Sequence, residues 1–368
     1  MNAVPIFPES RNPVPAAVAL LLAMVAVVLA AGCAGDCPGV LHTATITKLD
    51  GNGTVSWTKV LDSGLSNTIA DAIPTSDGGF VTAGSIVTTH SYCTLNSQAR
   101  IIRFTGTGDI LWDRSISDLG GASEIIQMHD GGFAALVSGN NIYRLDPEGK
   151  MLWNNSAISS SLYQRSMINS KDGSLYIVGP EFIKLDSNGI ILWQRSIVNG
   201  LHKWFFSVAE VGKGQGFYIF SAVNRSDIQK DFFNNDGAFL NSTNIVTGRN
   251  LTGYHLFNNP NGFKLLYSEN SVNVTIIEFD INGSVIDIKR ITGSNDITLT
   301  EDMGYFFVAN TGNQIKAVKL NPDETTSWNT TIPINLRNLN IINIIQTTDG
   351  GFVIISDNGV QKDISTLQ

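Results

Sequence analysis

The chain has 368 residues, of which 43% are hydrophobic and 15% are charged, and this balance excludes a mainly disordered protein. The formal net charge is −8 and Lys and Arg form no run, so the basic surface that a phosphate backbone requires is missing. We therefore expect no nucleic-acid partner.

Residues 1–32 are predicted to be a signal peptide or a membrane anchor. Residues 16–32 form an uncharged apolar run, which is short for a membrane span and typical of the apolar part of a signal peptide. The stretch Ala30-Ala31-Gly32-Cys33 resembles the lipobox of bacterial and archaeal lipoproteins, which implies lipidation of Cys33. The stretch "ESRNPVP" before the run also resembles the start of archaeal pilin-like proteins, in which the apolar helix is retained. Simple cleavage for secretion is the third alternative.

Export agrees with the cysteines and the glycosylation sequons. If Cys33 is lipidated, Cys37 and Cys93 remain as a pair, and an extracytoplasmic compartment permits a disulfide between them. Two free thiols are the alternative. Eight Asn residues lie in Asn-x-Ser/Thr sequons, which is mild support for export: Asn52, Asn154, Asn224, Asn241, Asn250, Asn273, Asn282 and Asn329. We predict an extracytoplasmic protein anchored to the cell membrane, with residues 33–42 as a short tether.

From residue 43 onward, two turn motifs alternate along the chain. The first is Asp-Gly-Gly-Phe, at 77–80, 130–133 and 349–352, with weaker copies ending at Leu175, Phe217, Phe263 and Tyr305. The second has the form hydrophobic-Asp-x-x-Gly-x-x-x-Trp and occurs at 49–57, 104–112, 145–153, 185–193 and 320–328, with weaker copies at 233–241 and 279–287. Each motif thus occurs seven times, and each supplies the backbone flexibility that a tight turn between strands needs.

The repeats predict an all-β, seven-bladed propeller of four-stranded antiparallel blades over residues 43–368. One unit reads as strand a, an Asp-Gly-Gly turn, strand b, a connection, strand c, an Asp-x-x-Gly turn and strand d. The chain begins with strands c and d, at 43–61, and ends with strands a and b, at 340–356. We expect these two halves to pair and close the ring, which also hides sheet edges.

The repeat series resembles the PQQ-like β-propeller group, which includes quinoprotein dehydrogenases and outer-membrane assembly lipoproteins. In that group the motif Trp residues dock one blade on the next, so the resemblance implies a structural role for Trp57, Trp112, Trp153, Trp193 and Trp328. The adjacent Cys-Cys pair of many quinoproteins is missing here. We therefore expect no bound PQQ and no other cofactor.

Few residues indicate chemistry. The five His residues lack the spacing of metal ligands, and no nucleophile elbow or phosphate loop occurs, so we predict no metal and no catalytic residue. The longest b–c connection, 85–99, carries His90 and Tyr92 and is a candidate binding loop, although a tolerated insertion explains it as well. A basic residue precedes the second motif in five units: Lys48, Arg103, Arg144, Lys184 and Lys319. These cations would either hold an anion or lie against acidic neighbours.

The sequence favours a monomeric, non-catalytic propeller that binds a cell-surface protein or glycan through the face formed by its b–c and d–a connections. The alternative is an enzyme at the mouth of the central channel, either a degenerate quinoprotein or a glycan-active hydrolase or lyase. Acidic residues occur on predicted loops, at Asp118, Glu124 and Asp296, but the sequence does not bring two of them together. A third possibility is a scaffold that pairs a peptide with an exposed strand edge.

Overall fold

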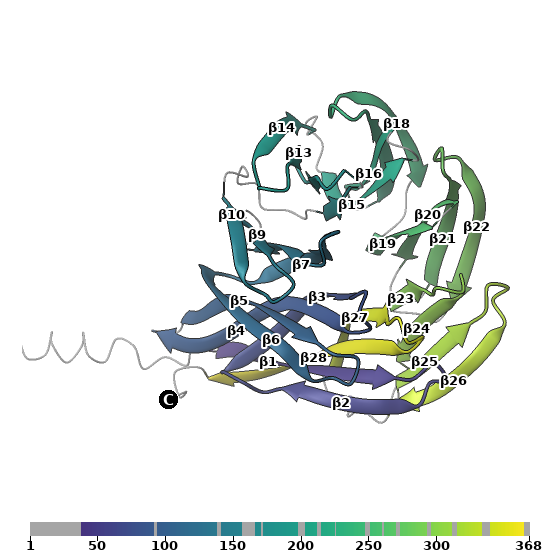
Figure 1. Ribbon diagram of the computed structural model, residues 1–368. Helices are drawn as coiled ribbons and strands as arrows, with labels where there is room; N and C mark the ends of the chain where they lie inside the picture. Colours follow the sequence, from purple (N-terminus) through teal and green to yellow (C-terminus); the bar gives the residue numbers. More distant parts are fainter. Residues whose placement is uncertain are drawn as a thin grey trace, which may run out of the picture.

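The fold is a seven-bladed β-propeller, as predicted. The computed structural model describes residues 38–91, 94–137, 141–156, 166–170, 172–197, 203–211, 215–224, 226–246, 251–259, 261–269, 273–292, 296–310, 315–332 and 339–363. These residues form 28 strands in seven four-stranded antiparallel sheets set around a central axis (Figure 1). In this part of the chain, no helix has the length and apolar character needed to cross a lipid bilayer.

Each blade contains four strands, a to d, and we number the blades from the one that closes the ring. Blade 1 contains β27 (Leu339–Gln346), β28 (Phe352–Asp363), β1 (Pro38–Leu49) and β2 (Val55–Leu61). Blade 2 contains β3 (Ser66–Pro74), β4 (Phe80–Ser91), β5 (Thr94–Phe104) and β6 (Ile110–Leu119). Blade 3 contains β7 (Ala122–Gln127), β8 (Phe133–Val137), β9 (Asn141–Leu145) and β10 (Met151–Asn155). Blade 4 contains β11 (Ser166–Asn169), β12 (Leu175–Val178), β13 (Glu181–Leu185) and β14 (Ile191–Ser196).

The remaining three blades follow the same order. Blade 5 contains β15 (Lys203–Val211), β16 (Gly216–Val223), β17 (Asp227–Phe233) and β18 (Phe239–Val246). Blade 6 contains β19 (Leu251–Asn259), β20 (Gly262–Glu269), β21 (Asn273–Asp280) and β22 (Val285–Thr292). Blade 7 contains β23 (Asp296–Leu299), β24 (Tyr305–Asn310), β25 (Ile315–Leu320) and β26 (Thr326–Ile332). Strand a is innermost and strand d forms the outer edge of every sheet.

The two ends of the chain share blade 1, in the sheet order β2-β1-β28-β27. The central pair β1 and β28 runs without a break from Pro38↔Asp363 to Leu49↔Phe352. The ring is therefore closed by the pairing that the split repeat predicts. Because β1 begins at Pro38, residues 38–42 belong to the propeller strand, whereas they were expected to form part of the tether.

The turns form as the motifs predict. In the a–b turn of blade 2, Gly78 has a φ of 90°, which favours glycine, and the Asp77 carboxylate accepts a hydrogen bond from the Gly79 N–H at 3.3 Å. The Phe that follows the turn enters the core, and Phe80 and Phe133 have no exposed surface. Burial of one such side chain stabilises the fold by roughly 1.5–3 kcal/mol. The Asp-Gly-Gly-Phe motif therefore combines a turn with a core residue.

The core consists of clusters between neighbouring blades rather than one central mass. One cluster joins Val81 of blade 2 to Phe133 of blade 3, and another joins Phe306 of blade 7 to Phe352 of blade 1. The rings of Phe306 and Phe352 are stacked with centroids 3.9 Å apart. Each blade is thus stable only against its neighbours, which is the physical reason why the repeat must close into a ring.

The five motif Trp side chains each reach the c–d turn of the next blade. Trp112 is an example, because its Nε1 donates a hydrogen bond to the Pro147 carbonyl at 2.9 Å and its ring lies over Gly149. A Cβ on Gly149 would lie 2.6 Å from the Trp112 ring, so this position needs a glycine for space as well as for its φ of 75°. The same ring-over-glycine contact is made by Trp57 with Gly108, Trp153 with Gly189, Trp193 with Gly237 and Trp328 with Gly53.

The two units without a motif Trp use other contacts. In blade 5, whose motif ends at Asn241, Tyr218 of β16 lies over Gly283 and donates a hydrogen bond to the Asn282 carbonyl at 2.6 Å. In blade 6, the motif ends at Asp287. Lys289 forms ion pairs with Asp287 at 3.9 Å and with Glu324, in the c–d turn of blade 7, at 3.3 Å. The blade interface is therefore kept by a different side chain in each case.

Candidate functional site

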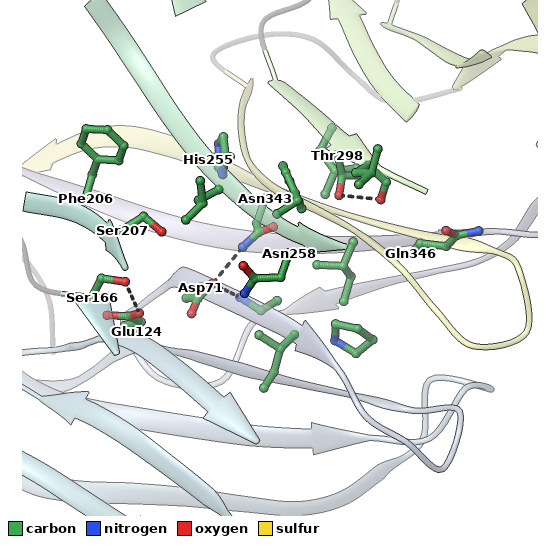
Figure 2. A pocket seen from close by; sticks show the side chains of 18 of the residues that line it. Asp71, Glu124, Ser166, Phe206, Ser207, His255, Asn258, Thr298, Asn343 and Gln346 are labelled. Carbon is green, nitrogen blue, oxygen red and sulfur yellow. Dashed lines mark hydrogen bonds between the residues drawn. The ribbon is translucent and has the colours of Figure 1, made fainter. Parts of the chain in front are cut away.

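The innermost strands surround a central channel with a cavity of about 1030 Å³. All seven a strands contribute residues to its wall, from β3 in blade 2 to β27 in blade 1 (Figure 2). The channel is the candidate functional site because it is the concave surface on which every blade presents side chains.

The innermost strands carry a polar residue at the same register position in every blade. In each blade, strand b carries a buried aromatic residue or Leu directly after the a–b turn. The third residue beyond it pairs with a residue of strand a that is polar in all seven blades. We call these seven residues of strand a the polar ring. Its pairs are Asp71↔Ala83, Glu124↔Leu136, Ser166↔Val178, Ser207↔Phe220, His255↔Leu266, Asp296↔Val308 and Asn343↔Ile355. Among the members whose side chains are described, most are half-buried and His255 is exposed, so this level of the channel wall is polar.

Asp71 connects three blades through its carboxylate. Its Oδ2 accepts a hydrogen bond from the Ile125 N–H of blade 3 at 2.9 Å, and its Oδ1 accepts from the Asn343 side-chain amide of blade 1 at 3.1 Å. The Ala72 N–H also donates to Oδ1, at 2.8 Å. Burial raises the pKa of Asp71 above its ordinary value, and these hydrogen bonds oppose the shift only in part.

Glu124 makes the corresponding contact one blade further on. Its Oε1 accepts hydrogen bonds from the Met167 N–H at 2.8 Å and the Ser166 hydroxyl at 3.4 Å, both in blade 4 (Figure 2). Burial, helped by the negative charge of Asp71 and opposed by the hydrogen bonds from Met167 and Ser166, raises the pKa of Glu124 to about 8. Oε2 is shielded from solvent and has no hydrogen-bond partner among the described residues. Glu124 is therefore protonated at neutral pH, with one carboxyl oxygen unused.

These carboxyl groups have a clear structural task. Each side chain satisfies a backbone N–H of the next blade, at Ile125 or Met167, which would otherwise be left without a partner inside the ring. Of the oxygens of Asp71 and Glu124, only Glu124 Oε2 remains free for chemistry. His255 is exposed, and its positive form would lower the pKa of Asp71. The described residues contain no group of three or more His, Cys, Asp or Glu side chains that could hold a metal ion.

The five repeated cations lie against acidic neighbours. Each pairs with the Asp of the a–b turn in its own blade, at N to O distances of 2.5 to 2.9 Å: Lys48 with Asp349, Arg103 with Asp77, Arg144 with Asp130, Lys184 with Asp172 and Lys319 with Asp302. Partial burial acts to raise the pKa of these carboxyl groups. Hydrogen bonds from the cation and the turn outweigh it, and the pKa of Asp349 falls to about 2.

The two remaining blades lack both members of this pair. Blade 5 has Phe232 at the cation position, and its a–b turn, "GKGQG", contains no acid. Blade 6 has no acid in its turn and carries Glu278 at the cation position, which pairs with Lys264 at 3.5 Å. Cation and turn acid thus occur together or not at all, which identifies the cations as part of the structural repeat rather than an anion site.

The candidate loop at 85–99 is mainly strand. β4 and β5 continue their pairing through Ser85↔Ala99 and His90↔Leu95 to Ser91↔Thr94, so the segment is a long two-stranded ribbon rather than a loop. Its β-branched residues explain the difference, because "SIVTT" favours strand. Tyr92, Cys93, Cys33 and Cys37 lie outside the described residues, and so do the expected lipidation and disulfide.

The acidic residues named from the sequence lie in strands instead of loops. Asp118 is in β6 at the rim of blade 2, whereas Glu124 in β7 and Asp296 in β23 belong to the polar ring. Asp71 was missed, although the sequence contains a signal for it. Asp71, Glu124, Ser166, Asp296 and Asn343 each stand six residues before the turn Asp of their blade.

The ring of blades and the polar channel define the protein as a seven-bladed β-propeller. No protein-family model matches the chain. No curated protein matches it either. Among solved structures, it is similar to BamB from Moraxella catarrhalis, with 14% identity, a TM-score of 0.41, and coverage of 82% of this chain and 88% of that one.

Two further solved structures show the fold more closely. The periplasmic gluconolactonase PpgL of Pseudomonas aeruginosa has 10% identity, a TM-score of 0.53, and coverage of 80% of this chain and 97% of that one. The Dos1 propeller has 10% identity, a TM-score of 0.51, and coverage of 78% and 92%. At these identities the likeness concerns the fold alone.

Proposed function

We propose that this chain is an extracytoplasmic, membrane-tethered propeller that binds a cell-surface protein or glycan and performs no catalysis. The observation that carries the proposal is the unequal length of the blades on the face of the b–c connections. In blade 2, β4 has 12 residues, whereas strand b has 4 to 8 residues in blades 3 to 7. At about 3.3 Å per residue, β4 is longer by roughly 13 to 26 Å.

The neighbouring blade 1 is extended in the same way. β1 and β28 each have 12 residues, and their pairing continues to Pro38↔Asp363 on the b–c side. Figure 1 shows the end of β28 and the tip of β4 on the same side of the ring. Two long ribbons from adjacent blades give this face a feature that the regular turns of the opposite face lack, as recognition of one partner would require.

The proposed location rests on the N-terminal apolar run and its lipobox-like end, on the sequons, and on the likeness to a periplasmic propeller. Because β1 begins at Pro38, a tether that precedes this strand would hold the ribbons near the membrane. The partner would then be a component of the cell surface.

Site-specific photo-crosslinking in native membranes tests the binding face. A crosslinking residue at Thr89, in the β4 ribbon, is expected to form one discrete adduct. The same residue at Lys150, in a c–d turn on the opposite face, is the matched control and should form none. Equal crosslinking from both positions, or none from Thr89, would contradict the proposal.

A second candidate is a glycan-active enzyme with its site in the channel, and Glu124 favours it. A carboxyl group with a pKa of about 8 and a free Oε2, close enough to Asp71 to interact with its charge, resembles a general acid beside a second carboxyl group. Loss of turnover of surface glycans in Glu124→Gln, with turnover retained in Ser123→Ala, would support this candidate. Absence of turnover by the unaltered protein would leave the binding function.

A further inference from the structure

The outer strands of the seven blades expose one edge each. β2, β6, β10, β14, β18, β22 and β26 stand at the end of their sheets, with no strand beyond them. Such edges present free backbone N–H and C=O groups that pair readily with another chain, and proteins protect them with charged side chains, among other means. A propeller has as many unprotected edges as blades unless each outer strand carries such a group.

Four of the seven outer strands carry charges. The charged residues are Lys59 in β2, Asp113, Arg114 and Asp118 in β6, Arg195 in β14, and Asp287, Lys289 and Arg290 in β22. The other three, β10 (MLWNN), β18 (FLNSTNIV) and β26 (TSWNTTI), contain no charged residue and no Pro. These three edges lack the protection that the other four possess.

Each of these three strands contains a sequon asparagine, and the four charged strands contain none. The residues are Asn154 in β10, Asn241 in β18 and Asn329 in β26. All three are exposed, and none donates a side-chain hydrogen bond to another described residue. The division of the seven edges is thus complete, with a charge or a sequon on every outer strand.

The sequon asparagines share one property, which is that their side chains are exposed. All seven sequon Asn residues in the described part of the chain are exposed. By contrast, Asn67, Asn155 and Asn343 are buried or half-buried, lie outside sequons, and use their amides to bond Ser63, Gly189 and Asp71. Asn155 is next to Asn154, so the difference is not one of region. The sequon amides are therefore accessible for modification.

We propose that Asn154, Asn241 and Asn329 carry N-linked glycans and that these glycans take the place of charges in protecting the edges of β10, β18 and β26. The proposal rests on the extracytoplasmic location proposed above. The donor would be an oligosaccharide activated as a lipid phosphate or diphosphate. The amide Nδ2 bonds to the anomeric carbon, the bond from that carbon to the phosphate oxygen breaks, one amide proton is lost, and the phosphate leaves with the electron pair.

Protection matters most where the edge is also apolar. Phe239 and Leu240 of β18 are 51% and 52% exposed, and Met151 and Leu152 of β10 are 55% and 52% exposed. An uncharged edge with exposed apolar residues is a site for strand-to-strand aggregation. A bulky hydrated glycan on the same strand would prevent a second strand from approaching closely enough to pair.

The first test is glycopeptide mass spectrometry on the full-length protein from its native cells. We expect glycan masses on the peptides that contain Asn154, Asn241 and Asn329. Glycans on Asn52 or Asn282 but not on the three edge residues would overturn the proposal while leaving the location intact. If external protease digests the protein on whole cells but no glycan is found, the proposal is also overturned and the location stays intact. Failure of external protease to reach the protein would instead refute the proposed location.

The second test asks whether the glycan replaces a charge, in a host without N-glycosylation. There, the unaltered sequence is expected to lose its monomer peak in size-exclusion chromatography. The triple variant Asn154→Lys, Asn241→Lys and Asn329→Lys should restore the peak. The matched control, Asn52→Lys, Asn224→Lys and Asn282→Lys, adds the same charge away from the edges and should not restore it. Equal behaviour of the two triple variants, or a monomeric unaltered protein, would overturn the proposal.

Discussion

The contact between a motif Trp and the glycine of the next blade predicts a specific loss of stability in Gly149→Ala. The new Cβ would lie 2.6 Å from the Trp112 ring, far inside contact distance, so either the ring or the turn must move. If the ring moves, the hydrogen bond from Trp112 Nε1 to the Pro147 carbonyl at 2.9 Å is lost as well.

The expected magnitude has two parts. Placing an alanine at a φ of 75° costs about 1–2 kcal/mol in backbone strain. Forcing a methyl group into a packed contact costs typically about 1–3 kcal/mol more. We therefore expect Gly149→Ala to lower the free energy of unfolding by about 3 kcal/mol.

Gly173→Ala is the control that separates these two parts. Gly173 has a φ of 79°, close to that of Gly149, but an added Cβ there has no atom within 4 Å. This variant should lose only the strain, about 1–2 kcal/mol. Urea unfolding followed by tryptophan fluorescence gives both values. An equal loss in the two variants would refute the reasoning, because the docking contact would then contribute nothing.

Three further predictions concern single side chains. In Asp349→Asn, Lys48 loses its ion-pair partner, and stability should fall by about 1 kcal/mol at pH 7. Because the pKa of Asp349 in the folded protein is lowered to about 2, the difference in stability from the unaltered protein should close in urea titrations as pH falls from 4 towards 2. Glu124→Gln should gain stability relative to the unaltered protein as pH rises from 5 to 8. The pKa of Glu124 is raised to about 8, so the folded state holds a proton that the unfolded chain releases. A constant difference in the free energy of unfolding across these pH values would contradict the burial. Tyr218→Phe should cost about 1 kcal/mol through the lost hydrogen bond to the Asn282 carbonyl, measured by thermal unfolding.

The repeat made most of the fold predictable. The turns need particular residues, and Asp-Gly-Gly and Asp-x-x-Gly provide them at regular spacing, so strand order and ring closure follow from the sequence alone. The ribbon at 85–99 was not predicted, because it lacks a clear turn motif and its strand pairing depends on a partner strand. The β-branched residues of "SIVTT" favour strand, but how far the strand extends depends on its pairing with β5.

The polar ring escaped the sequence analysis for a different reason. Asp71 and Glu124 are ordinary acidic residues in ordinary strands, and only the register of seven strands places them at one level of the channel. Their raised pKa values depend on burial that arises when neighbouring blades pack together. A search at a fixed distance before each turn Asp would have found the position, but not its burial.

The closure of blade 1 has a consequence for the order of folding. β1 is the first strand of the described chain to be synthesised, and its central partner β28 is the last. A chain that emerges with its N-terminus first therefore holds the paired strands β1 and β2 without β28 and β27 until the other blades have left the ribosome. Contacts between residues so far apart in sequence form slowly. The Lys48 to Asp349 ion pair bridges the same two ends, so it can form only after both halves of blade 1 have met.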